Sequence, residues 1–131
     1  LKGLAMTMDP ILQLGKGGLT PENTAAVEEA LAARQEGKRG VKFLTEANGC
    51  LSGCCSGVTI YLEKEFNPAP GYHDDQEGFF VLEGEGYAKL GDCEFPIKPG
   101  DSFIALPKVR HTIRTNDESR PVKVFWFHSA V

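Results

Sequence analysis

Short apolar runs separated by turn-forming residues dominate the chain from about residue 41 onward. The runs are rich in the β-branched and aromatic residues that favour strands, and they read VKFL, GVTIYLEKEF, FFVLEGEGYAKL, CEFPI, DSFIAL, HTIRT and VKVFWFH. The segments between them have the composition of turns and read NPAPGYH, GD, KPGD and NDESRP. Seven or so short strands at this spacing predict an all-β sandwich or barrel. Within FFVLEGEGYAKL, the pair Glu83-Gly84 predicts the bend of a β-hairpin.

The first 40 residues have a different pattern. Residues 1 to about 18 are glycine-rich at their end and predict an irregular arm. An α-helix is expected over about residues 21–36, because Thr20 is a good N-cap, Pro21 suits the first helical position and the following run is rich in helix formers. We therefore expect an arm and helix over residues 1–40, packed on the barrel or on a dimer partner, and a barrel over residues 41–131.

Composition and charge narrow the classes of function. The 131 residues fit one domain, and the formal net charge of −4 comes without a stripe or run of Lys and Arg, so nucleic acid is not an expected partner. No apolar run approaches the roughly 18 residues that span a bilayer, and no signal peptide is recognised, so we expect no membrane partner and a cytoplasmic location. The four cysteines are then expected to be reduced thiols.

The chain contains only three histidines, and their placement relative to Glu77 indicates a possible metal site. Glu77 follows His73 by four residues, and an extended chain would point Gly71, His73, Asp75 and Glu77 to one face. His111 opens a later strand. Two imidazoles and one carboxylate on facing strands form a set that suits Fe(II) and Mn(II) and can also hold Zn(II), Ni(II) or Co(II). The sequence therefore predicts one divalent transition metal on His73, Glu77 and His111.

The sequence leaves the identity of further metal ligands undecided. The fourth ligand is either water or Asp75, which has the same parity, while Tyr72 and Asp74 are expected to point away. His128, near the end of the last apolar run, is another candidate if Val124, Trp126 and His128 face inward, and otherwise it is a terminal surface residue.

At these residues the sequence resembles the cupin superfamily, in its small single-domain form. The first cupin motif runs Gly, five residues, His-x-His, three or four residues, Glu, six residues, Gly. Here Glu77 is followed by six residues and then Gly84, and His73 stands at the second His. In the second motif, Gly100 and His111 have the required separation, and KPGD is similar to the family. The resemblance covers about residues 55–128 and implies an antiparallel jelly-roll barrel with a metal inside it.

The sequence departs from the family pattern at several positions. The family's first metal His is Gly71 here, so that one of the usual four ligands is absent. In the second motif, Leu106 stands at the Pro position, Lys108 replaces Gly, and Thr115 replaces Asn. These last three changes are expected to alter only a turn.

The resemblance implies a class of function rather than one reaction. We expect a metal-dependent enzyme, an oxygenase or an isomerase, that acts on a small polar metabolite such as a hydroxy acid, a diketone or a sugar. The alternatives are a non-catalytic cupin that senses a small ligand and a metal-free structural barrel. Arg110 and Arg114 could meet a substrate carboxylate, or they are solvated strand residues. A homodimer is expected, because small cupins often pair barrels by their edges or N-terminal segments.

Two other patterns have plainer explanations. The segment NGCLSGCCSG matches no usual zinc spacing and is interpreted as a glycine-rich loop or strand with small buried thiols. Six aromatic residues could stack on a substrate ring, but most are expected to fill the barrel core. They are Phe79, Phe80, Phe103, Phe125, Trp126 and Phe127.

Overall fold

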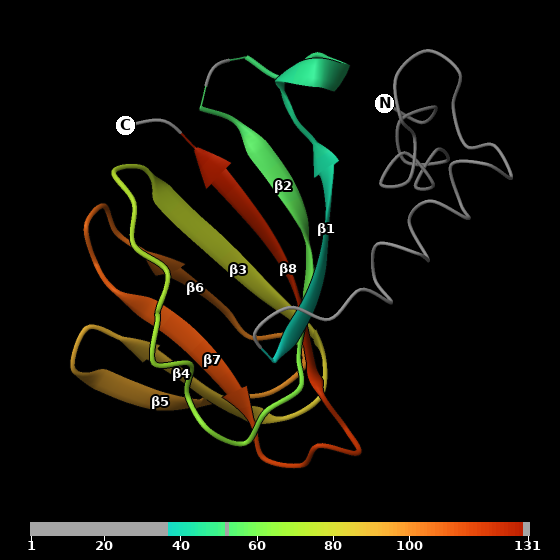
Figure 1. The fold of residues 1–131 in the computed structure, drawn as a ribbon, viewed down its shortest axis with the longest axis vertical. Helices are drawn as coiled ribbons and strands as arrows, with labels where there is room; N and C mark the ends of the chain where they lie inside the picture. Colours follow the sequence, from blue (N-terminus) through green and yellow to red (C-terminus); the bar gives the residue numbers. More distant parts are fainter. Residues whose placement is uncertain (1–36, 52, 130–131) are drawn as a thin grey trace, which may run out of the picture.

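Eight strands and one short 3-10 helix make up the part of the chain that the computed structural model describes, residues 37–51 and 53–129 (Figure 1). The elements are β1 (Lys38–Leu44), η3 (Glu46–Asn48), β2 (Cys55–Tyr61), β3 (Gln76–Glu83), β4 (Gly86–Leu90), β5 (Cys93–Ile97), β6 (Ser102–Ala105), β7 (His111–Thr115) and β8 (Val122–Ser129). The α-helix expected over residues 21–36 lies outside the described residues and stays a prediction.

The strands form two sheets that face each other (Figure 1). The larger sheet has the order β1-β2-β8-β3-β6 and the smaller sheet has the order β5-β4-β7. Every pairing is antiparallel, and strands far apart in sequence, such as β2 and β8, lie side by side. The prediction of an all-β antiparallel jelly roll is confirmed. The first described strand begins at Lys38, three residues before the expected start of the barrel.

The predicted hairpin over FFVLEGEGYAKL is wrong in its pairing and right in its bend. Strand β3 pairs with β6 and β8 in the larger sheet, whereas β4 pairs with β5 and β7 in the smaller sheet. The bend at Gly84 (φ +79°) therefore carries the chain from one sheet to the other. A Cβ atom at Gly84 would lie 2.2 Å from the carbonyl oxygen of Pro121, so both the left-handed backbone and the close packing require glycine there.

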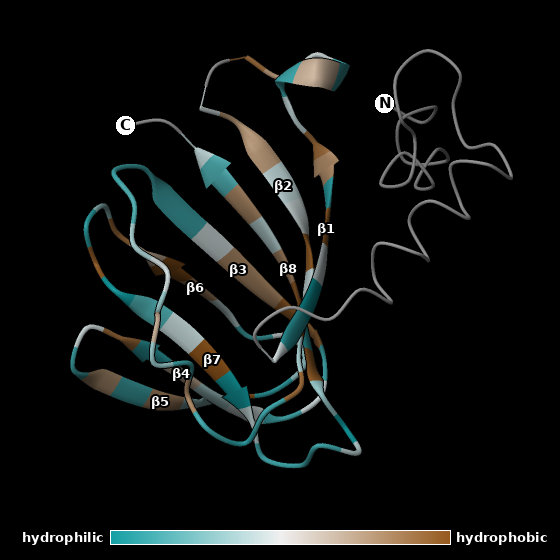
Figure 2. Ribbon diagram, in the orientation of Figure 1, coloured by the Kyte–Doolittle hydropathy of each residue, from teal (hydrophilic) through white to brown (hydrophobic). Residues whose placement is uncertain are grey.

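The hydrophobic core fills the space between the two sheets. Alternation along β3 buries Phe79 and Val81 and leaves Phe80 and Leu82 exposed, as expected for a strand with one face on the core. The start of β3 and the end of β8 are hydrophilic, whereas the middle of each of these strands is hydrophobic (Figure 2). The core consists of Phe79, Val81, Ala88, Ile97, Ala105, Ile113, Val122, Val124 and Trp126.

The six aromatic residues divide between the two faces of the larger sheet. Phe79, Phe103 and Trp126 belong to or pack against the core between the sheets, as predicted. Phe125 packs in a second cluster with Phe43 and Val58, and the side chains of Phe80 and Phe127 are exposed. The expectation that most of the six fill the barrel is wrong for Phe80, Phe125 and Phe127, because alternation along the strands places these three on the outer face.

The cysteine-rich segment is a loop that leads into β2. Of its thiols, Cys54 is exposed and Cys50 and Cys55 are half-buried, so the expected burial of these thiols is not observed. The candidate metal clusters found among the described residues contain no cysteine. Within the same residues, no helix has the length and apolar character needed to span a membrane.

Gly84→Ala is predicted to destabilise the protein more than Gly91→Ala. Both glycines have a positive φ, +79° and +60°. An alanine there costs of the order of 1 kcal/mol, but only at Gly84 does the new methyl group collide with backbone, since nothing lies within 4 Å of it at Gly91. Urea unfolding should give losses of about 3 and about 1 kcal/mol respectively. Equal losses in the two variants would contradict this account of the bend.

Candidate metal centre

One loop and the ends of three strands bring the polar residues together at one end of the barrel. His73 and Asp75 lie in the loop before β3, and Glu77 is the second residue of β3. His111 opens β7, and His128 lies near the end of β8, where it pairs in register with Glu77. All three histidines of the chain therefore lie near Glu77, in two overlapping groups of possible ligands: His73, Glu77 and His111, and His73, Asp75 and His128.

Backbone hydrogen bonds hold the loop that carries His73 against β7. Gly71 and His111 form an antiparallel bridge, in which the N–H of each donates to the carbonyl oxygen of the other at 2.8 and 3.0 Å. The N–H of Lys108 donates to the carbonyl oxygen of His73 at 2.8 Å. Lys108 has φ +62°, so this turn keeps the left-handed conformation although Lys replaces the glycine of the cupin motif. These bonds place His73 and His111 next to each other.

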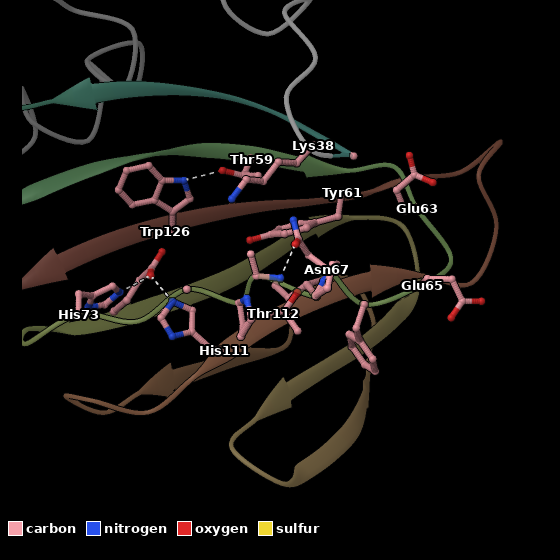
Figure 3. A pocket seen from close by; sticks show the side chains of 18 of the residues that line it. Lys38, Thr59, Tyr61, Glu63, Glu65, Asn67, His73, His111, Thr112 and Trp126 are labelled. Carbon is pink, nitrogen blue, oxygen red and sulfur yellow. Dashed lines mark hydrogen bonds and ion pairs between the residues drawn. The ribbon is translucent and has the colours of Figure 1, made fainter.

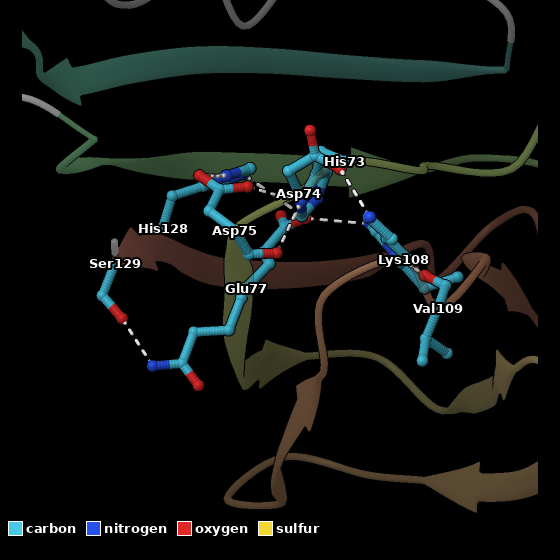
Figure 4. Close-up of polar contacts among 10 residues, drawn as sticks. His73, Asp74, Asp75, Glu77, Lys108, Val109, His128 and Ser129 are labelled. Carbon is cyan, nitrogen blue, oxygen red and sulfur yellow. Dashed lines mark hydrogen bonds and ion pairs between the residues drawn. The ribbon is translucent and has the colours of Figure 1, made fainter. Parts of the chain in front are cut away.

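The carboxylate of Glu77 lies among the three imidazole rings (Figures 3 and 4). Its Oε2 atom is 3.0 Å from Nε2 of His73, 2.9 Å from Nε2 of His111 and 3.4 Å from Nε2 of His128. The side chains of Glu77 and His111 are buried, with 11% and 8% of their surface exposed, so water screens their interaction little. One ligand atom each from His73, Glu77 and His111 lies within 4.8 Å of the others. This donor set fits a divalent transition metal.

The outer nitrogen of each ring has an oxygen acceptor. Nδ1 of His111 donates to the carbonyl oxygen of Val109 at 2.9 Å. Nδ1 of His73 lies 2.6 Å from Oδ1 of Asp75, and Nδ1 of His128 lies 2.9 Å from Oδ2 of the same carboxylate. With a metal bound at Nε2, a proton on each Nδ1 gives the tautomer that metal-ligating histidines adopt. In the metal-free protein the Nε2 atoms of His73 and His111 instead donate hydrogen bonds to the Glu77 carboxylate.

Without a metal, Glu77 and His111 stabilise each other's charged forms. Burial alone would raise the pKa of Glu77, but hydrogen bonds from His111 and His73 outweigh burial and lower the pKa. Burial alone would lower the pKa of His111, but its hydrogen bonds to Glu77 and to the carbonyl group of Val109 raise the pKa. The pKa of Asp75 is also lowered, because the hydrogen bond and charge of His128 overcome the opposing effect of burial.

A cavity of about 690 Å³ opens from this cluster (Figure 3). His73 and His111 lie at one side of the cavity, and Glu63 and Glu65 lie at the other. Burial raises the pKa of the Tyr61 hydroxyl, and the nearby charge of Glu77 raises it further, so this group stays protonated. The remaining polar lining comes from Lys38, Lys42, Thr59, Asn67 and Thr112. The volume suits a small metabolite.

The expected directions of the neighbouring side chains are confirmed. Tyr72 is 54% exposed and the side chain of Asp74 is 87% exposed, so both point away from the cluster. Asp75 does reach the cluster, although residues 72–75 form a loop and not the extended strand on which the parity argument depended. Its carboxylate faces the outer nitrogens of His73 and His128.

The basic residues at the cavity differ from those that the sequence suggested. The guanidinium of Arg110 lies over the ring of Tyr72, and that of Arg114 over the ring of Tyr87; neither residue lines the cavity. Lys38 and Lys42 do line it. Lys38 and Lys42 are four residues apart, so an extended strand points both side chains to one face. The sequence does not show which face that is, because this depends on the pairing of β1 with β2.

The pH dependence of stability in the metal-free protein should report the Glu77–His111 pair. The lowered pKa of Glu77 contributes stability that is complete above its ordinary value of 4.5 and is lost as the pH falls. The raised pKa of His111 contributes stability that is complete below its ordinary value of 6.5 and is lost as the pH rises through the raised value. With a chelator present, the difference in unfolding free energy between the wild type and Glu77→Gln should therefore be largest between these two values. Glu83→Gln, at the exposed end of β3 where Glu83 pairs with Lys123, is the control. A pH-independent difference for Glu77→Gln would contradict the coupling.

Comparison with known proteins agrees with this architecture. A family model described as a cupin domain matches residues 58–128, more than half of the 131 residues. A search of curated protein sequences found no match. Among solved structures, the cupin domain of Schizosaccharomyces pombe Cnp3 is similar with a TM-score of 0.63 at 14% identity, over 74% of this chain and 67% of that one.

Two further structures have the same fold. A predicted oxalate decarboxylase from Thermotoga maritima has a TM-score of 0.62 at 14% identity, over 72% of this chain and 81% of that one. The Fe(II) form of HppE has a TM-score of 0.56 at 22% identity, over 70% of this chain and 50% of that one. The similarity at these identities concerns the fold alone. The family match over residues 58–128, on two facing antiparallel sheets, shows that this chain belongs to the cupin family.

Proposed function

We propose that this cupin is a metal-dependent enzyme, of the oxygenase or isomerase type, that acts on a small polar metabolite. The observation that carries the proposal is the convergence of His73, Glu77 and His111 at one side of a cavity large enough for such a substrate. A predicted oxalate decarboxylase and an Fe(II) protein among the structural neighbours are consistent with metal chemistry on this fold.

The chain's own residues would hold the metal and orient the substrate. When bound by His73, Glu77 and His111, an Fe, Mn, Ni, Zn or Co ion supplies Lewis acidity, or activation of dioxygen if it is iron. The imidazoles bind as neutral ligands and Glu77 is the anionic ligand. The indole N–H of Trp126 donates to Oγ1 of Thr59 at 2.9 Å, and both side chains line the cavity.

Two ammonium groups of the cavity lining could receive a carboxylate on the metal side, with Glu63 and Glu65 at the opposite side. Lys38 and Lys42 line the cavity, and Lys38 is close enough to His111 for its positive charge to act on that ring. An acid could place two oxygens at the metal centre while its negative charge lies near these ammonium groups. We therefore propose a hydroxy or oxo acid as the first class to screen.

Removal of any one proposed ligand should abolish tight metal binding. Elemental analysis of the purified wild type, after incubation with Fe(II), Mn(II), Ni(II), Co(II) or Zn(II), should find about one equivalent of metal. His73→Ala, Glu77→Gln and His111→Ala should each retain little metal while remaining folded by circular dichroism. Glu83→Gln is the matched control for Glu77→Gln, since it changes the same group on the same strand, and it should bind metal normally.

The same preparations separate the alternative functions. Turnover of hydroxy acids, diketones or sugars, followed by oxygen consumption or by isomer formation, should occur in the metal-loaded wild type and be lost in the three variants. Metal and ligand binding without turnover would favour a sensor, and the enzyme proposal would fail. A wild type that takes up none of these metals would favour a structural barrel.

We also propose a homodimer formed through the outer face of the larger sheet. Gly78 pairs with Ile104 on β6 and with Phe127 on β8, so these two side chains lie on the face that Phe80 also shares. Their exposed fractions are 43% for Ile104, 42% for Phe127 and 45% for Phe80. An exposed apolar face can pack on its own copy across a two-fold axis.

Ile104→Glu should convert such a dimer to a monomer, because it buries a charge in the interface. Leu51→Glu is the control, since Leu51 is an 85% exposed apolar residue in the loop between η3 and β2. Light scattering should find a dimer for the wild type and for Leu51→Glu. A dimer that persists in Ile104→Glu and is lost on deletion of residues 1–18 would assign the interface to the N-terminal segment instead.

A cytoplasmic location is proposed, as expected from the sequence, and the free, exposed thiols of Cys54 and Cys93 are compatible with a reducing compartment.

A further inference from the structure

Gly71 stands where the cupin motif has a metal-binding histidine, and the structure has no room for a side chain there. A Cβ atom at Gly71 would lie 2.3 Å from Nε2 of His111 and 2.9 Å from both neighbouring ring carbons. The ring cannot easily move aside, because it is buried and its Nδ1 is bonded to Val109. Any shift of the ring would also move Nε2 of His111 away from the carboxylate of Glu77. Packing thus excludes a ligand at position 71 as long as His111 stays in the cluster.

A third imidazole approaches Glu77 from a different strand, and its ligand atom lies within 4.8 Å of those of His73 and Asp75. His128, near the end of β8, has its Nε2 3.4 Å from Oε2 of Glu77, the atom that His73 and His111 also approach. Its ring centroid is 4.5 Å from that of His73. The side chain of His128 is only 18% exposed, so it is not a surface residue.

Asp75 holds the rings of His73 and His128 in the orientation that ligation needs. Its Oδ1 lies 2.6 Å from Nδ1 of His73, and its Oδ2 lies 2.9 Å from Nδ1 of His128. Both oxygens are therefore engaged on the outer side of the rings, away from Glu77. A carboxylate that accepts the Nδ1 proton of a histidine fixes the ring and makes its Nε2 a better ligand.

We propose that Nε2 of His128 is the fourth protein ligand, in place of the histidine absent at Gly71, and that Asp75 is a positioning residue for His73 and His128. The inference rests on the proposed metal centre and extends it to a set of three imidazoles and one carboxylate. An ion with six positions would then keep two for the oxygens of a substrate.

Nuclear magnetic resonance of the three histidines tests this ligand set directly. The full chain contains only three histidines, so a protein labelled with ¹⁵N in histidine gives one ring spectrum for each residue. Zn(II), which is diamagnetic, is the probe. After one equivalent of Zn(II), all three rings should keep the proton on Nδ1 and change their Nε2 shifts together.

The possible outcomes separate this inference from the proposed function. Changes at His73 and His111 alone would overturn the role of His128 and leave the three-ligand site intact. No change at any ring would contradict the proposed metal centre as a whole, and with it the proposed function. A second equivalent of Zn(II), bound through Nδ1 atoms and lost in Asp75→Asn, would make Asp75 a ligand of another site and overturn its positioning role.

Two variants give an independent measure by Zn(II) competition with a chromophoric chelator. His128→Gln should weaken binding by more than about 100-fold, whereas Asp75→Asn should weaken it by about 10- to 100-fold and keep one equivalent. Ser129→Ala and Asp74→Asn are the controls, because each changes a polar neighbour without facing Glu77. Unchanged affinity in folded His128→Gln would overturn the inference.

Discussion

The proton on the outer nitrogen of each histidine is the constraint on which the site depends. Val109 accepts that proton from His111, and Asp75 faces the Nδ1 atoms of His73 and His128. The inner nitrogens and the Glu77 carboxylate then face one another, an arrangement that needs a proton or a metal cation between them. In the metal-free protein a proton takes the place of the metal cation. Hydrogen bonding to Glu77 therefore raises the pKa of His111 despite burial. A divalent metal satisfies all of these acceptors at once.

The barrel supports this arrangement through strand register. The pairing of β3 with β8 sets Glu77 directly opposite His128, and the bridge between Gly71 and His111 closes the loop onto β7. A slip of one residue would turn Glu77 to the outer face, because side chains alternate along a strand. The apolar core between the sheets fixes this register, so the hydrophobic pattern that drives folding also assembles the polar end of the barrel.

Much of this could be predicted from the sequence, and the exceptions have a common cause. Strand positions follow from local periodicity, and the trio of His73, Glu77 and His111 follows from its match to the cupin motifs. The sequence does not predict that β3 and β4 belong to different sheets, because a bend at Gly84 fits either a hairpin or a passage of the chain from one sheet to the other. The cavity position of Lys38 likewise depends on the register of an edge strand. Such features arise from contacts between residues far apart in the chain.

The most direct test of the central claim is anomalous diffraction from a crystal grown with Co(II). The account predicts one anomalous peak at the end of the barrel, among the inner nitrogens of His73, His111 and His128 and the carboxylate of Glu77. No peak among these atoms in a crystal with saturating Co(II), or a peak on Asp75 and the outer nitrogens instead, would contradict the account.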